Sequence, residues 1–305
     1  MHARRLFLTA LSLLLIFAMG FTVVRANVLG MGERFDRLTA RIENFVDPPP
    51  DRSTLPTVVV TEEPSASASA SASATPETTL TPSASPTPSP TPLVRTPVDV
   101  AVVEDQPAVF ASQLTDKDCA VAATQMVLTI LGLGDTSDGF QQGIKESIGE
   151  WESLEDSLNG GWGPAAVSLA LADYGATGYE IRAYASYADA LRDSAIAITE
   201  MDKPVVMFPW WGAHSWVMTG FRADADPTLF ADAAISGAYI LDPWFPRVSS
   251  IWGPSDGPGN FEDLAELKRN WPVGTERDGW TRPEGAYPER DGRFVVLIPT
   301  TPRDS

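Results

Sequence analysis

The chemistry available to this chain depends on its single cysteine, Cys119. Residues 118–131, DCAVAATQMVLTIL, predict a helix that has Asp118 as its N-cap and Gly132 directly after its end. At the start of a helix the unpaired N–H groups and the helix dipole stabilise an anion, so this position favours a reactive thiolate. A lone cysteine excludes an intramolecular disulfide and a multi-cysteine metal site. Cys119 is therefore either a buried core residue or a nucleophile.

His214 is the candidate base for this thiol, because the chain's other histidine is His2. A carboxylate that accepts a hydrogen bond from the imidazole would orient it, and Asp242, at the end of an expected strand, could do so. Gln113, six residues before Cys119, could donate from its amide to a developing oxyanion. Each residue also has an ordinary interpretation: a core histidine beside tryptophans, an Asp-Pro turn and a solvated glutamine.

The elements that must position these residues change along the domain from helices to strands. Helices are expected at 118–131, 139–149, 164–174, 186–200 and 261–270. Strands are expected at 98–103, 178–184, 204–209, 214–221, 238–242 and 293–298. Helices followed by an antiparallel sheet predict an α+β fold.

Aromatic residues are concentrated around the candidate base. Trp210, Trp211 and Trp216 flank His214 and could form the walls of a substrate cleft. The proline-rich segment 244–261, WFPRVSSIWGPSDGPGNF, could form a lid or a specificity loop, or be an ordinary surface excursion.

Three segments, QLTDKDCAVAATQMVL, GAHSWVMTGF and YILDPW, resemble the peptidase C-39-like family of papain-like cysteine peptidases, relatives of the domains that cleave double-glycine leaders in bacteriocin export. The resemblance implies that Cys119 is the nucleophile, His214 the base, Asp242 its orienting partner and Gln113 the oxyanion donor. It also implies a papain-like fold with N-terminal helices packed on an antiparallel sheet, a peptide or protein substrate, and no metal or cofactor. Ala120 stands where the family commonly has glycine, and no ATP-binding cassette follows.

The composition divides the chain into four parts. Residues 1–26 begin with a short basic start, Arg4 and Arg5, followed by an apolar run, 6–24, which predicts a cytoplasmic tip and a membrane-spanning signal anchor, or a cleaved signal peptide. Residues 27–47 predict a juxtamembrane amphipathic segment. Residues 48–97, rich in Pro, Ser, Thr and Ala, predict a disordered stalk. Residues 98–305 are the expected peptidase domain, exported and close to the membrane or the cell wall.

Charge and residue types limit the function classes. A net charge of −18 excludes nucleic acid as the expected partner, because a phosphate backbone requires a basic surface. Another exported Cys–His acyl-transfer enzyme remains an alternative: a transglutaminase-like protein, or a cell-wall amidase, although amidases usually have a second histidine. The nine tryptophans also leave open a catalytically idle binding module displayed on a stalk.

Overall fold

The computed structural model describes residues 56–61, 93–147, 151, 162–273, 288–290 and 292–303. Its helices are α3 (Cys119–Ile130), α4 (Asp138–Glu146), α6 (Pro164–Asp173), α7 (Tyr187–Met201), α8 (Pro209–Gly212) and α9 (Leu264–Asn270), with the 3-10 turns η3 (Gln106–Val109) and η4 (Pro288–Arg290). Its strands are β1 (Val58–Thr61), β2 (Val98–Ala101), β3 (Tyr179–Tyr184), β4 (Val205–Met207), β5 (Trp216–Ala223), β6 (Ile235–Leu241), β7 (Val248–Ser249), β8 (Gly253–Pro254), β9 (Asn260–Asp263) and β10 (Phe294–Pro299).

Eight of these strands form one mixed sheet. Its order is β1-β3-β10-β4-β5-β6-β9, and β2 pairs with the end of β5 beyond β4. Every pairing is antiparallel except β1 with β3, which is parallel. Strands β7 and β8 form a separate two-stranded ribbon.

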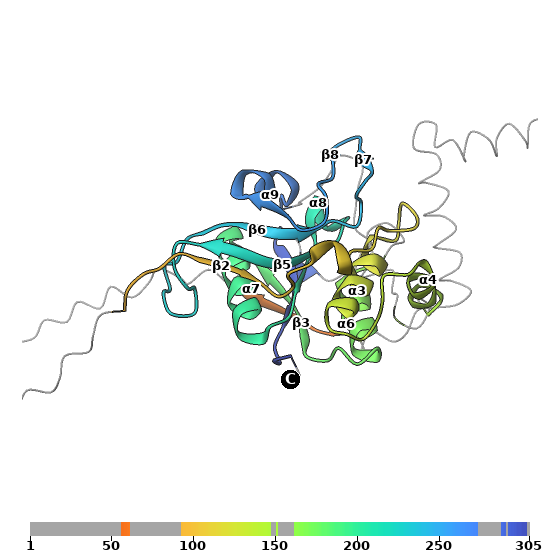
Figure 1. Cartoon of the computed structure of the whole chain (residues 1–305), viewed down its shortest axis with the longest axis horizontal. Coiled ribbons are helices and arrows are strands. Elements are labelled where there is room, and N and C mark those ends of the chain that lie inside the picture. The colour runs from red at the N-terminus through yellow and green to blue at the C-terminus, as the bar shows by residue number, and fades with distance from the viewer. Residues whose placement is uncertain are drawn as a thin grey trace, which may run out of the picture.

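Helices cover both faces of the sheet, because side chains along a strand point alternately to opposite sides. Val206 and Leu297 pack with α3 and α6 in one buried cluster. Their neighbours Val205 and Val296 pack with α7 and α9 in a second cluster on the other face. Helices α3, α4 and α6 gather at one end of the molecule, while α9 and the β7–β8 ribbon lie along another side (Figure 1).

The fold is a mixed α/β arrangement, and it corrects the expected antiparallel sheet at its edge. Residues 58–61 lie within the segment 48–97, for which no fold was expected, yet they form β1 beside β3. Three valines and a threonine have high strand propensity, and a short run of them is enough to add an edge strand to an existing sheet. The expected helices at 118–131, 164–174 and 186–200 correspond closely to α3, α6 and α7.

The expectation of a single-pass, membrane-anchored protein requires correction. In the part of the chain that the structure describes, no helix has the length and apolar character needed to cross a membrane. Segments 1–26 and 27–47, for which the anchor and the amphipathic helix were predicted, lie outside the described residues.

Candidate active site

Cys119 is the first residue of α3 and is partly exposed. Asp118 occupies the N-cap position as expected, but its side chain does not cap the helix. Its carboxylate instead accepts a hydrogen bond from the backbone N–H of Thr115 and pairs with Lys145, 2.8 Å away. Lys145 neutralises a buried negative charge next to the thiol, and the first N–H groups of the helix are not occupied by Asp118.

His214 follows a strained turn that connects β4 to β5. Trp210 and Trp211 have φ angles of 55° and 58°, in the left-handed region that bulky residues rarely adopt. Gly212 continues the turn with φ 79°, and the His214 N–H donates to the carbonyl of Pro209. Such backbone strain costs on the order of 1–3 kcal/mol per residue and is common at functional sites. Here the turn buries His214, which is 2% exposed and lies two residues before the start of β5.

Asp242 lies beside His214 because β5 and β6 are paired, with Val217 opposite Leu241. The His214 Nε2 and the Asp242 Oδ1 are 2.6 Å apart. The same carboxylate accepts a hydrogen bond from the Trp244 N–H and one from Ser255. Burial acts to raise the pKa of Asp242, but the positive charge of His214 and these hydrogen bonds outweigh it and lower the pKa. Asp242 is therefore an ionised, hydrogen-bonded partner for the imidazole.

His214 also interacts with Cys119. Burial acts to lower the pKa of His214, but the charge and hydrogen bond of Asp242, together with those of Cys119, raise it to about 9. Because Nε2 faces Asp242, Nδ1 is the ring nitrogen left for the sulfur. The structure thus brings three of the four predicted site residues into one chain of contacts, Cys119–His214–Asp242, with an imidazole that stays protonated at neutral pH.

Gln113, the fourth predicted residue, is buried in the loop before α3. Its Nε2 donates to the Thr115 carbonyl at 2.7 Å, so one of its two amide N–H donors is engaged within the loop and one remains. Its backbone N–H donates to the carbonyl of Pro243, the residue after Asp242. The loop that contains Gln113 is therefore attached directly to the loop that follows β6.

Two side chains that the sequence analysis did not single out hold the Gln113 loop. Gln141, buried on α4, donates to the Ser112 carbonyl and accepts from the Leu114 N–H, and so binds both neighbours of Gln113. Gln141 also donates to Gln125 on α3, at 2.8 Å.

Arg247 binds the same loop. Its guanidinium donates to the carbonyls of Gln113 and Leu114 and pairs with Asp116. Such contacts between distant loops carry no periodic signal in the sequence.

Tryptophans surround the imidazole on the side away from α3. Trp210 stacks on His214 with ring centroids 4.0 Å apart, and Trp244 meets His214 edge-on. Trp252 lies parallel to Trp210, with centroids 5.9 Å apart. The segment 244–261 thus contributes two indoles to the site. Trp216, expected on a cleft wall, is 1% exposed and packs within the second core cluster.

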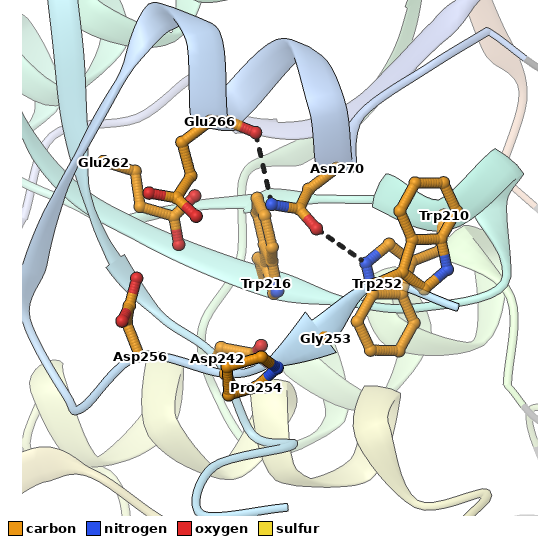
Figure 2. A pocket seen from close by; sticks show the side chains of 11 residues that line it. Trp210, Trp216, Asp242, Trp252, Gly253, Pro254, Asp256, Glu262, Glu266 and Asn270 are labelled. Atoms are coloured by element: carbon orange, nitrogen blue, oxygen red, sulfur yellow. Dashed lines mark hydrogen bonds between the residues drawn. The ribbon is translucent and has the colours of Figure 1, made fainter. Parts of the chain in front are cut away.

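A small pocket adjoins Asp242 on this side of the site (Figure 2). It is lined by Trp210, Trp216, Asp242, Trp252, Gly253, Pro254, Ser255, Asp256, Glu262, Glu266 and Asn270. Glu262 is 4% exposed, and burial, with the nearby Glu266, Asp242 and Asp256, raises its pKa to about 8 against the opposing effect of Arg269.

Comparisons with known proteins are sparse. No family model matches the chain, and no curated protein matches it. One similar solved structure is a double glycine motif protease from an AMS/PCAT transporter, in complex with the leader peptide. It is 16% identical, with a TM-score of 0.33, and the match covers 63% of this chain and 91% of that chain. At this TM-score the likeness is too low to establish a family.

Proposed function

We propose that this chain is a cysteine peptidase of the papain-like, peptidase C-39-like type, which hydrolyses peptide bonds in a peptide or protein substrate. The observation that carries the proposal is the buried His214–Asp242 pair, 2.6 Å apart, in contact with Cys119 at the start of α3. A thiol, an imidazole and a carboxylate in this order are the parts of an activated nucleophile.

The first half of the reaction forms an acyl-enzyme. The Cys119 thiolate attacks the carbonyl carbon of the peptide bond, and the carbonyl oxygen becomes an oxyanion. The Cys119 backbone N–H and the remaining amide N–H of Gln113 donate to that oxygen. As the C–N bond breaks, the His214 imidazolium gives its proton to the departing amine, which leaves a thioester on Cys119.

The second half of the reaction releases the acyl group. His214, now neutral, takes a proton from a water molecule, which attacks the thioester carbon. The C–S bond breaks, a carboxylic acid leaves, and the thiolate–imidazolium pair is restored. Asp242 keeps the imidazole in one orientation through both halves and stabilises its positive charge.

Alkylation of Cys119 by iodoacetamide tests the proposal, because a chain with one cysteine has one labelling site. At about pH 6 an ordinary thiol is almost entirely protonated and reacts slowly. We expect rapid labelling of the full chain at this pH, and a labelling rate at least about tenfold lower in His214→Ala, which lacks the paired imidazolium. His2→Ala, which removes the chain's other histidine, should label like the wild type.

Hydrolysis of a peptide mixture, followed by mass spectrometry, completes the test. The wild type should release new amino termini, and Cys119→Ser should release none. Equal labelling rates in wild type and His214→Ala would overturn the proposed role of His214. Incorporation of an added amine in place of water would assign the same three residues to a transferase.

A further inference from the structure

The pocket beside Asp242 combines acidic and aromatic walls. Its carboxylates come from three separate places: Asp242 at the end of β6, Glu262 on β9, and Glu266 on α9. Asp256, from the loop between β8 and β9, faces the same space (Figure 2). The nearest basic group on these elements, Arg269, pairs with Glu266 and is largely exposed. Asp242 is balanced by His214 and Glu266 by Arg269, so Glu262 and Asp256 are the pocket carboxylates without an ion pair among the described residues.

Glu262 is the strongest sign that this pocket receives a ligand. The side chain is almost fully buried, and its Oε2 has no hydrogen-bond partner among the described residues. A buried carboxylate oxygen without a partner is unfavourable unless a proton or a cation accompanies it. The unpartnered oxygen of Glu262 is thus the group in this pocket that a cation could satisfy.

The aromatic walls suit a cation. Trp210 and Trp252 line the pocket with parallel rings, and an indole face attracts an ammonium group within about 6 Å. The pocket has room for a group of about the size of one water molecule. An ammonium head fits that space, whereas a planar guanidinium is larger.

The pocket lies on the side of the site that would receive the part of the substrate after the scissile bond. His214 delivers its proton to the departing amine, so the substrate segment after the scissile bond must pass over the imidazole. Trp210 stacks on His214 with one face and lines the pocket beyond it. A side chain of the leaving segment can therefore reach the pocket.

We propose that this pocket is a subsite for the ammonium group of a lysine side chain in the leaving segment of a peptide substrate. That the lysine belongs to a peptide substrate rests on the proposed peptidase function. That the pocket binds an ammonium group does not. Asp256 and Glu262, which gives up its proton to the entering cation, bind the charge, Trp210 and Trp252 flank it, and arginine is disfavoured by its size.

A lysine mimic tests the pocket without turnover. We would titrate the full chain with n-butylammonium, n-butylguanidinium or 1-pentanol and follow indole fluorescence and calorimetric heat. We expect saturable binding of n-butylammonium, and at least about tenfold weaker binding of the other two probes. Glu262→Gln should weaken n-butylammonium binding at least about fivefold, whereas Glu200→Gln, an exposed glutamate on α7, should leave it unchanged.

Proton release gives a second readout that a mere change in packing would not produce. The groups around Glu262 are Asp242, Asp256 and Glu266, with Arg269 opposing them and Tyr187 of α7 also within electrostatic reach. Near pH 7 Glu262 is mostly protonated, so an entering cation should displace its proton. Calorimetry in two buffers of different ionisation enthalpy should show this release in wild type and not in Glu262→Gln.

The outcomes separate this inference from the proposed function. If n-butylammonium does not saturate the protein, or if Glu262→Gln binds it equally well, the pocket holds only a trapped water and the inference is wrong. If peptides are cleaved with no enrichment of lysine over arginine and norleucine after the scissile bond, the subsite is wrong while the peptidase stands. If n-butylammonium binds wild type and Cys119→Ser alike but no peptide is cleaved, the pocket stands and the peptidase falls.

Discussion

At the scale of single residues, His214 shows how several weak constraints define one orientation. Asp242 holds Nε2, Trp210 covers one ring face, and the strained turn before β5 fixes the backbone. A buried imidazole without these partners would be neutral at physiological pH, because burial disfavours the charged form. Its pKa is raised instead, since the adjacent carboxylate outweighs burial. The residue type supplied the chemistry, and its neighbours set the protonation state.

Glu262 provides a residue-scale prediction about stability and pH. Its pKa in the folded protein is about 8, above its ordinary 4.5. Stability is therefore fully present below about pH 4.5 and is lost as the pH rises through about 8. Glu262→Gln removes this ionisation, so the variant should gain stability relative to wild type across that window, on the order of 4 kcal/mol by its end.

Urea unfolding at several pH values from about 5 to 9 measures this difference. Glu200→Gln, on the exposed face of α7, should follow the wild type throughout. His214, whose pKa is about 9 against an ordinary 6.5, adds a decline between those two values that both proteins share. A constant difference between Glu262→Gln and wild type would show that Glu262 is ionised at all these pH values.

At the scale of elements, the site is an assembly of loops held by buried glutamines and one arginine. Gln125 on α3 binds the carbonyls of Asp135 and Ser137 and accepts from Gln141. Gln141 in turn binds the loop that carries Gln113. These amide groups are buried and hydrogen-bonded to one another. Removing one of them therefore weakens the hydrogen bonds of the others.

Gln141→Ala tests this series. The change leaves the Ser112 carbonyl and the Leu114 N–H without their partner, so the free energy of unfolding should fall by about 1–3 kcal/mol. On the proposed function, kcat should fall about tenfold with little change in KM, because a displaced Gln113 stabilises the oxyanion less well. The exposed neighbour offers a matched control: Gln142→Ala should change neither quantity. A loss of stability with unchanged kcat would separate the loop's anchoring from catalysis.

At the scale of the whole molecule, the sheet separates two hydrophobic clusters and places the site residues along one region of it. Cys119 comes from the α3 side, while His214 lies just before β5 and Asp242 just after the adjacent strand β6. The chain carries a net charge of −18, which gives the protein as a whole a negative electrostatic field. Such a field raises the encounter rate of cationic substrates and falls away as salt screens it.

Salt dependence is therefore the prediction that belongs to the whole molecule. For a lysine-containing peptide substrate, kcat/KM should fall about tenfold when the ionic strength rises from about 0.01 M to about 1 M. The same peptide with norleucine in place of lysine should change less than about twofold. Initial-rate measurements on the two peptides check this, and an equal salt response would show that the charge of the chain does not steer its substrate.

The sequence by itself determined the local parts of this protein. Helical periodicity and a helix start placed Cys119 at the beginning of a helix, and strand patterns placed His214 first in one expected strand and Asp242 last in another. In the structure β5 begins at Trp216 and β6 ends at Leu241, so both residues lie just outside the strands. Local propensity decides such features, because they depend on residues close in the chain. The tertiary structure alone decided that β1 pairs in parallel with β3, that Asp118 binds Lys145, and that Glu262 lies buried near Asp242. These features depend on side chains far apart in sequence, whose desolvation and pairing energies exist only once the chain has folded.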